Sequence, residues 1–195
     1  MRVRGATFVL ALLTFASWGA PLEAADAPSS ASPIAPPPVD SASPVPSVDW
    51  IEFHNTHTDA SLKVTFRDAN GFVPSALEQF DEILGDHRSH ERRKMDPQLF
   101  VLLVDLAAAA GTEPRYDIIS GFRSAGTNEK LRSNGGGQAK NSQHIEGKAI
   151  DVRLEGVSTD SLRNLARALK RGGVGYYPKS DFVHVDTARV RYWEG

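Results

Sequence analysis

Short stretches that alternate apolar and polar residues are separated by longer stretches with helical spacing. Residues 50–54 and 62–66 are rich in β-branched and aromatic side chains and flank a polar connection, which predicts a β-hairpin. A helix is predicted to begin at Pro74. Its apolar residues follow at spacings of three, three and one: Leu77, Phe80, Ile83 and Leu84.

Two further helices and four strands are predicted after this region. Asp96 followed by Pro97 marks a helix start, and the apolar run behind it continues to Gly111. Ser158 marks another start, and we expect Gly172-Gly173 to stop that helix. Short segments that predict strands lie at 116–120, 149–154, 174–177 and 182–186. This mixed order favours an α+β fold with a small, mainly antiparallel sheet and flanking helices.

Residues 1–24 have the layout of a secretory signal peptide. Arg2 and Arg4 precede an apolar run from residue 6 to about residue 16, and small residues follow. The alternative is a retained membrane anchor, but the run is shorter than the roughly 20 residues that span a bilayer. We expect cleavage near Ala20 or Ala24, and no stable membrane span afterwards.

Residues 25–47 are dominated by Pro, Ser and Ala. Eight of the twelve prolines in the chain precede Trp50. Such a segment cannot bury enough apolar surface to offset its ordering entropy, so we expect a disordered linker. The folded domain is therefore predicted to span residues 48–195, a length that can carry its own core.

Composition excludes several functional classes. The 195 residues contain no Cys, which removes disulfide frameworks, thiolate metal sites and thiol nucleophiles. The formal net charge of −2 gives no sign of the basic excess that a nucleic-acid surface requires. What remains is chemistry based on oxygen and nitrogen ligands.

The candidate chemistry lies in residues 142–151, SQHIEGKAID, and 181–186, DFVHVD. His144 is followed seven residues later by Asp151, and His184 lies on a later predicted strand. Catalytic zinc takes three protein ligands from His and Asp or Glu and leaves a fourth position for water. Gly147 would permit the sharp turn between a loop and the strand that carries Asp151. The pattern is compatible with a three-ligand zinc site.

These motifs, together with ISGFRS at 119–124 and GGVGYYP at 172–178, resemble the zinc murein peptidases of the lysostaphin, D-alanyl-D-alanine metallopeptidase and hedgehog superfamily. The resemblance covers roughly residues 50–193 and is strongest to the murein endopeptidase K group. It implies a hedgehog- or D,D-peptidase-like fold and one Zn²⁺ held by His144, Asp151 and His184. It also implies cleavage of bacterial wall peptides, in this group at cross-links between two diaminopimelate residues.

Two residues are candidates for the general base that peptide hydrolysis needs, one from the resemblance and one from its spacing. Relatives often carry an acid three residues before the last His ligand, and Asp181 occupies that position. Asp186, two residues after His184, points to the same face of an extended strand and could act as base or orient a ligand. We favour Asp181 slightly.

Arg123 follows a predicted strand and matches a family position near the substrate. Its guanidinium could bind a stem-peptide carboxylate or support a developing oxyanion, or it could be a surface residue that holds a loop.

Three functions remain open. The first is a periplasmic zinc endopeptidase acting on peptidoglycan cross-links, expected to be monomeric, with a D,D-carboxypeptidase on stem peptides as the alternative activity. The second is a wall-binding module that keeps the metal without hydrolysis. The third is a cytosolic metal-dependent hydrolase, which would require the signal-peptide interpretation to be wrong.

Overall fold

The computed structural model describes residues 49–195. The predicted signal peptide, 1–24, and linker, 25–47, lie outside the described residues, as does Val48.

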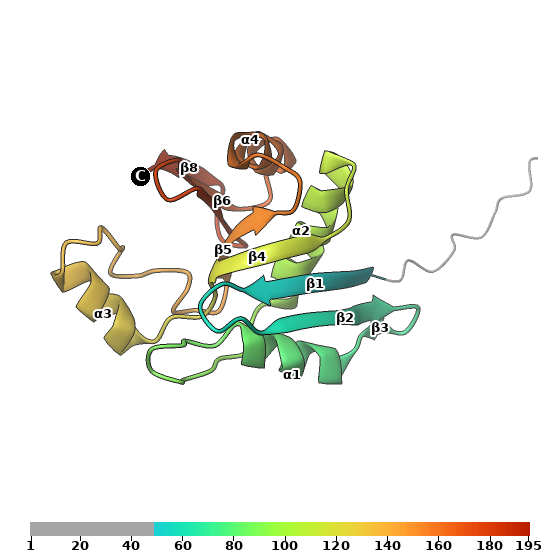
Figure 1. Cartoon of the computed structure of the whole chain (residues 1–195), viewed down its shortest axis with the longest axis horizontal. Helices are drawn as coiled ribbons and strands as arrows, with labels where there is room; N and C mark the ends of the chain where they lie inside the picture. Colours follow the sequence, from blue (N-terminus) through green and yellow to red (C-terminus); the bar gives the residue numbers. More distant parts are fainter. Residues whose placement is uncertain (1–48) are drawn as a thin grey trace, which may run out of the picture. The chain divides into compact units, whose positions relative to one another are not determined.

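An open sheet of eight strands forms the centre of this domain, in the order β3-β2-β1-β4-β5-β7-β6-β8 (Figure 1). The pairs β1–β4 and β6–β8 are parallel, and the other neighbouring pairs are antiparallel. The strands are β1 (Asp49–Asn55), β2 (Ser61–Asp68), β3 (Gly71–Phe72), β4 (Arg115–Ser120), β5 (Ala149–Leu154), β6 (Gly173–Tyr177), β7 (Phe182–Asp186) and β8 (Arg191–Glu194).

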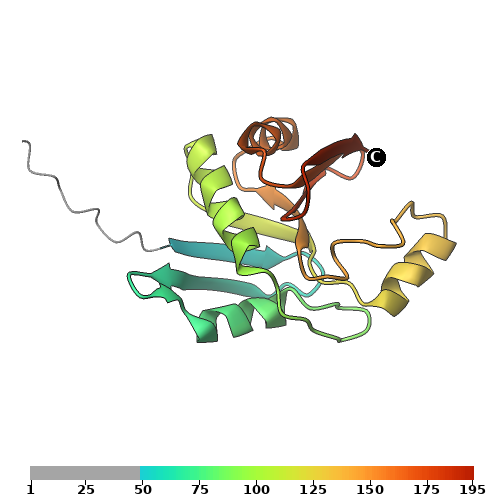
Figure 2. The same cartoon turned by 180° about the vertical axis from the view of Figure 1, so that it is seen from behind.

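Helices cover one face of the sheet. The helix α2 (Pro97–Ala110) crosses that face (Figure 2), and α1 (Pro74–Ile83) and α4 (Thr159–Leu169) pack beside it. Four fully buried rings join β1, β2, α1 and α2, with centroids 4.3–6.3 Å apart: Phe53, Phe66, Phe80 and Phe100. Because side chains alternate along each strand, the other face of the sheet is left for polar chemistry.

The caps explain where the helices begin and end. The Asp96 carboxylate accepts a hydrogen bond from the Gln98 amide, and Gly111 ends α2 in the left-handed conformation. The Ser158 hydroxyl accepts a hydrogen bond from the Ser161 amide at the start of α4. The predicted hairpin, the helices at Pro74 and Pro97 and the four later strands are confirmed.

Several expectations need correction. The α+β class is correct, but the sheet is larger than expected, because β3 and β8 add strands at its two edges. It is also mixed, because β1–β4 and β6–β8 pair in parallel. The α4 helix ends at Leu169, with Lys170 in the left-handed region (φ 53°), before the Gly172-Gly173 pair that was expected to stop it. The helix α3 (Ala125–Ser133) was not predicted.

No helix within residues 49–195 combines the length and the apolar character needed to cross a bilayer.

Asp86 connects the segment after α1 to the start of α3. Its side chain accepts hydrogen bonds from the Arg88 and Ser124 amides, each at 3.0 Å, and it is 3% exposed. Burial alone would raise the pKa of this carboxyl, but hydrogen bonds from Thr127, Ser124 and Arg88 outweigh burial and hold the pKa well below its usual range.

We predict that Asp86→Ala lowers the free energy of unfolding by about 1–3 kcal/mol at pH 7, because a buried amide loses its acceptor. A depressed pKa stabilises the fold above the unfolded value of about 3.9, and that contribution is lost as the pH falls further. The difference between wild type and variant, measured by urea unfolding, should therefore shrink below about pH 4. A difference that stays constant from pH 7 to pH 3 would contradict this role.

Candidate metal centre

The candidate site lies on the face of the sheet that the helices leave uncovered. Asp151 on β5 is directly opposite His184 on the neighbouring strand β7, so both side chains project from the same face. His144 comes from the loop before β5. Gly147, in the left-handed region (φ 68°), turns this loop, and a Cβ there would lie 2.5 Å from the Lys94 carbonyl oxygen. The turn thus requires glycine.

Three side-chain atoms converge closely at this point. His144 Nε2 lies 3.2 Å from Asp151 Oδ1 and 3.1 Å from His184 Nδ1, and the last two atoms are 2.9 Å apart. Ligands held at about 2.0–2.1 Å from a tetrahedral metal are separated by about 3.3 Å. The three residues are all buried and form a group that could hold a metal ion.

Hydrogen bonds on the far side of each imidazole fix which nitrogen faces the site. His144 Nδ1 lies 2.7 Å from the Gly121 carbonyl oxygen, which can only accept, so this nitrogen carries the proton. His184 Nε2 lies 3.0 Å from the Asp186 carboxylate and likewise donates. In the neutral imidazoles, the two converging nitrogens are therefore unprotonated. With both rings neutral, these three acceptors have no proton to share, and either a metal ion or an added proton can lie between them; this is the donor set of a metal site.

Burial acts against charge on these side chains. It lowers the pKa of His144. At Asp151, burial is outweighed by His144 and His184, which hold the pKa of this carboxyl below its usual range. At His184, burial is outweighed by hydrogen bonds with Asp151 and Asp186, which raise its pKa. A proton on His184 Nδ1 and a metal ion at the same atom exclude each other, so protons compete with the metal.

Asp186 is fully buried and fully hydrogen-bonded. Besides His184, its carboxylate accepts hydrogen bonds from the Gly173 and Ala188 amides and from both terminal nitrogens of Arg191, at 2.7–3.0 Å. Burial alone would raise its pKa, but these partners hold the pKa below the usual range. A carboxylate with no exposure and this many donors has no free access to substrate or solvent.

Asp181 has different surroundings. It lies in the β6–β7 turn with left-handed backbone (φ 53°), and its side chain is 66% exposed. The Thr159 hydroxyl donates to its carboxylate at 2.8 Å, and Arg153 Nε lies 3.3 Å from it. Asp181 lines a neighbouring pocket rather than the cavity over the three converging residues.

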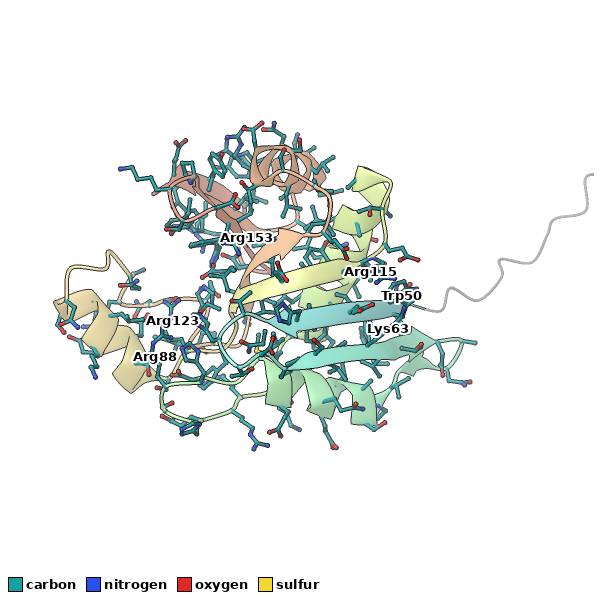
Figure 3. All side chains as sticks on the ribbon, viewed as in Figure 1. Trp50, Lys63, Arg88, Arg115, Arg123 and Arg153 are labelled. Atoms are coloured by element: carbon teal, nitrogen blue, oxygen red, sulfur yellow. The ribbon has the colours of Figure 1, made fainter. Side chains whose placement is uncertain are left out.

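Arg123 lies beside the cluster and is 8% exposed, so it is not a surface residue. One terminal nitrogen is 3.8 Å from Asp151 Oδ2, and the two donate to Asn128 and Ser120 at 3.4 and 3.2 Å. Its Nε has no hydrogen-bond partner. Burial lowers the pKa of this guanidinium, which still remains charged at neutral pH. Figure 3 labels Arg123 close to the end of β4.

A cavity of about 730 Å³ opens over the cluster. Its lining includes the loop of residues 135–143 and the aromatic residues Tyr177, Phe182 and Trp193. Arg191 and Trp193 were not among the residues predicted from the sequence, because the strand β8 was not predicted. The alternation of Arg191 and Trp193 in RYWE was the available signal, but four residues are a short run.

Comparisons with known proteins show the family to which the chain belongs. Residues 43–193 match the family model described as peptidoglycan L,D-endopeptidase MepK. The chain is 37% identical over 160 residues to the peptidoglycan L,D-endopeptidase MepK of Escherichia coli K12, covering 82% of this chain and 88% of the relative. It is 42% identical over 146 residues to the probable MepK of Haemophilus influenzae, covering 74% and 78%. No solved structure matches significantly. The resemblance to the murein endopeptidase K group is confirmed, and the chain belongs to the peptidoglycan L,D-endopeptidase MepK family.

Proposed function

We propose that this protein is a zinc-dependent endopeptidase that hydrolyses peptidoglycan cross-links between two diaminopimelate residues. His144, Asp151 and His184 are the proposed ligands, through Nε2, Oδ1 and Nδ1. The observation that carries the proposal is the convergence of these three unprotonated acceptors within 3.2 Å of one another. The relatives' names, L,D-endopeptidases of peptidoglycan, support the substrate class.

Zinc in such a site supplies Lewis-acid polarisation of a carbonyl and lowers the pKa of water enough to generate a nucleophile at neutral pH. The chain's own residues hold the site in shape. Gly121 and Asp186 fix the orientation of the two imidazoles through their far nitrogens. Burial of all three ligands excludes bulk water from one side of the site.

Arg123 is proposed to bind negative charge on the substrate. A buried guanidinium with an unpartnered Nε, lining the cavity, can accept a carboxylate or the oxygen of the scissile carbonyl. Diaminopimelate carries a carboxylate next to the cross-linking nitrogen. The same residue would suit a terminal carboxylate in a D,D-carboxypeptidase, which is the second candidate activity.

The two acidic candidates are proposed to have different roles. Asp186 is the orienting group for His184, since its carboxylate is buried and bound by five donors. Asp181 is the candidate general base, since it is exposed and three residues before His184. Its carboxylate lines the adjacent pocket, so this side chain would have to turn toward the cavity over His144, Asp151 and His184 to accept a proton there.

The cellular setting is proposed from the substrate. Peptidoglycan lies outside the cytoplasmic membrane, so we propose export by the segment 1–24, a linker at 25–47, and action in the periplasm as a monomer. The hedgehog- or D,D-peptidase-like fold is proposed on the motifs alone.

Replacing a proposed ligand should remove the metal. In His144→Ala, Asp151→Ala and His184→Ala, zinc measured by elemental analysis after dialysis should fall from about one ion per chain to near zero, because three protein ligands are the minimum of a catalytic site. His90→Asn is the matched control, since His90 is exposed and Asn tolerates its left-handed backbone (φ 59°). Near-stoichiometric zinc in all three ligand variants would refute the assignment.

The bond specificity can be read from defined muropeptides. The enzyme should split dimers linked through two diaminopimelate residues and leave the terminal D-alanine of monomeric pentapeptides in place, because residues 133–140 carry no bulky side chain that would close the cavity at its end. Chromatography of the products with and without chelator measures this. Release of D-alanine with dimers left intact favours the carboxypeptidase instead, and zinc binding without hydrolysis of either favours a wall-binding module.

The amide variants of Asp181 and Asp186 should differ in zinc binding and in turnover. Asp181→Asn should keep its zinc and lose about 10²–10⁴ in kcat, the usual contribution of a positioned base. Asp186→Asn should instead weaken zinc binding by about 10–100-fold, as loss of an orienting partner does. Zinc titration and turnover on the same preparations distinguish the two effects. Full activity in both variants would mean that neither carboxylate has the proposed role.

A further inference from the structure

The last strand, β8, lies at the edge of the sheet, and its side chains contact Asp186 and His184. It pairs with β6 in parallel register, with Arg191 opposite Gly173 and Trp193 opposite Gly175. On its other side, β6 pairs with β7, where Gly175 is opposite His184. One row across the sheet is therefore Asp151, His184, Gly175 and Trp193.

Gly173 leaves the space in which Arg191 reaches the carboxylate behind the site. A Cβ at position 173 would lie 2.4 Å from Arg191 Nη1 and 2.4 Å from Asp186 Oδ2. With no Cβ there, the two terminal nitrogens of Arg191 bind Asp186 Oδ1 and Oδ2 at 3.0 and 2.7 Å. This fork-to-carboxylate geometry holds Asp186 in one orientation.

Gly175 likewise leaves the space that the Trp193 side chain occupies. A Cβ at position 175 would lie 2.5 Å from the indole ring. The indole instead lies against His184, with centroids 5.0 Å apart, and its N–H donates to the Tyr177 hydroxyl at 2.9 Å. Arg191 lies over the same indole, 5.0 Å from the ring centre. The ring thus contacts both the imidazole and the arginine that supports it.

The negative charge of Asp186 requires a cationic partner such as Arg191. Asp186 is fully buried, and an unpaired buried carboxylate is strongly unfavourable. Within residues 49–195, Arg191 is the only permanently charged side chain that forms an ion pair with it. If Arg191 were absent, Asp186 could reorient toward other donors, and the hydrogen bond that fixes the His184 ring would loosen.

We propose that Arg191 and Trp193 are positioning residues of the metal centre. They hold Asp186 and the His184 imidazole so that Nδ1 faces the other two acceptors, and they thereby set the affinity of the site for zinc. This inference rests on the metal site proposed above. It assigns to the end of the chain a role that a purely stabilising edge strand would not have.

The test compares Arg191→Lys and Trp193→Phe with the controls Arg189→Lys and Trp50→Phe. The conservative variants keep charge or aromatic character. The controls change the same residue types: Arg189 is exposed and contacts Arg191 through its backbone carbonyl, which Lys retains, and Trp50 lies on β1 (Figure 3). Zinc affinity is measured by competition with a chromophoric chelator. We expect a loss of about 10-fold or more in Arg191→Lys and a smaller loss in Trp193→Phe, with the controls unchanged.

The absorption spectrum of the cobalt-loaded protein supplies a readout that general destabilisation does not move. At saturating Co²⁺, both site variants should show shifted d–d bands, because the His184 ligand is held differently, and the controls should match the wild type. Affinities within twofold of wild type together with unchanged spectra would overturn the inference while leaving the metal site intact. A wild-type protein that binds neither zinc nor cobalt would overturn the metal site itself, and this inference with it.

Discussion

Three hydrogen-bond acceptors that face one another without a proton between them are the constraint on which the rest of this site depends. Two imidazole nitrogens and a carboxylate oxygen, mutually 2.9–3.2 Å apart, repel unless a cation or a proton lies between them. The surrounding chain enforces the arrangement, because the Gly121 carbonyl and Asp186 occupy the far nitrogens of the two rings. The hydrogen bonding thus leaves a donor set that suits a metal ion, and family membership agrees with it.

The sheet provides the rigidity that such convergence needs. Asp151 and His184 face each other across an antiparallel pair, and their positions are set by backbone hydrogen bonds rather than by a loop. Only His144 comes from a loop, and Gly147 and the Gly121 carbonyl limit its freedom. Behind His184 a second set of contacts runs through Asp186 to Arg191. The neighbouring strands β5, β7, β6 and β8 therefore hold the site together. Gly173 and Gly175 on β6 leave the space that the Arg191 and Trp193 side chains occupy.

Much of this could be predicted from the sequence, and the gaps have physical causes. Pro97, Asp96 and Gly111 mark both ends of α2 because capping is a local property. The His144, Asp151 and His184 set was accessible from spacing and resemblance. The helix α3 was missed because its sequence, AGTNEKLRS, has almost no apolar period and is held by the Ser124 cap and Asp86. The strand β8 was missed because RYWE is only four residues long, and so short an alternation does not distinguish a strand from a loop. The different surroundings of Asp181 and Asp186 involve Thr159 and Arg191, which lie on other elements. They could therefore be seen only once the fold was known.

X-ray absorption at the zinc K-edge of the purified, zinc-loaded protein tests the central claim most directly, because it reports the ligands of the ion without reference to activity. The account predicts two imidazole nitrogens, visible by their multiple scattering, and oxygen from a carboxylate, at about 2.0–2.2 Å in a four-coordinate site. A spectrum with one imidazole or none, or with six oxygen ligands, would contradict it.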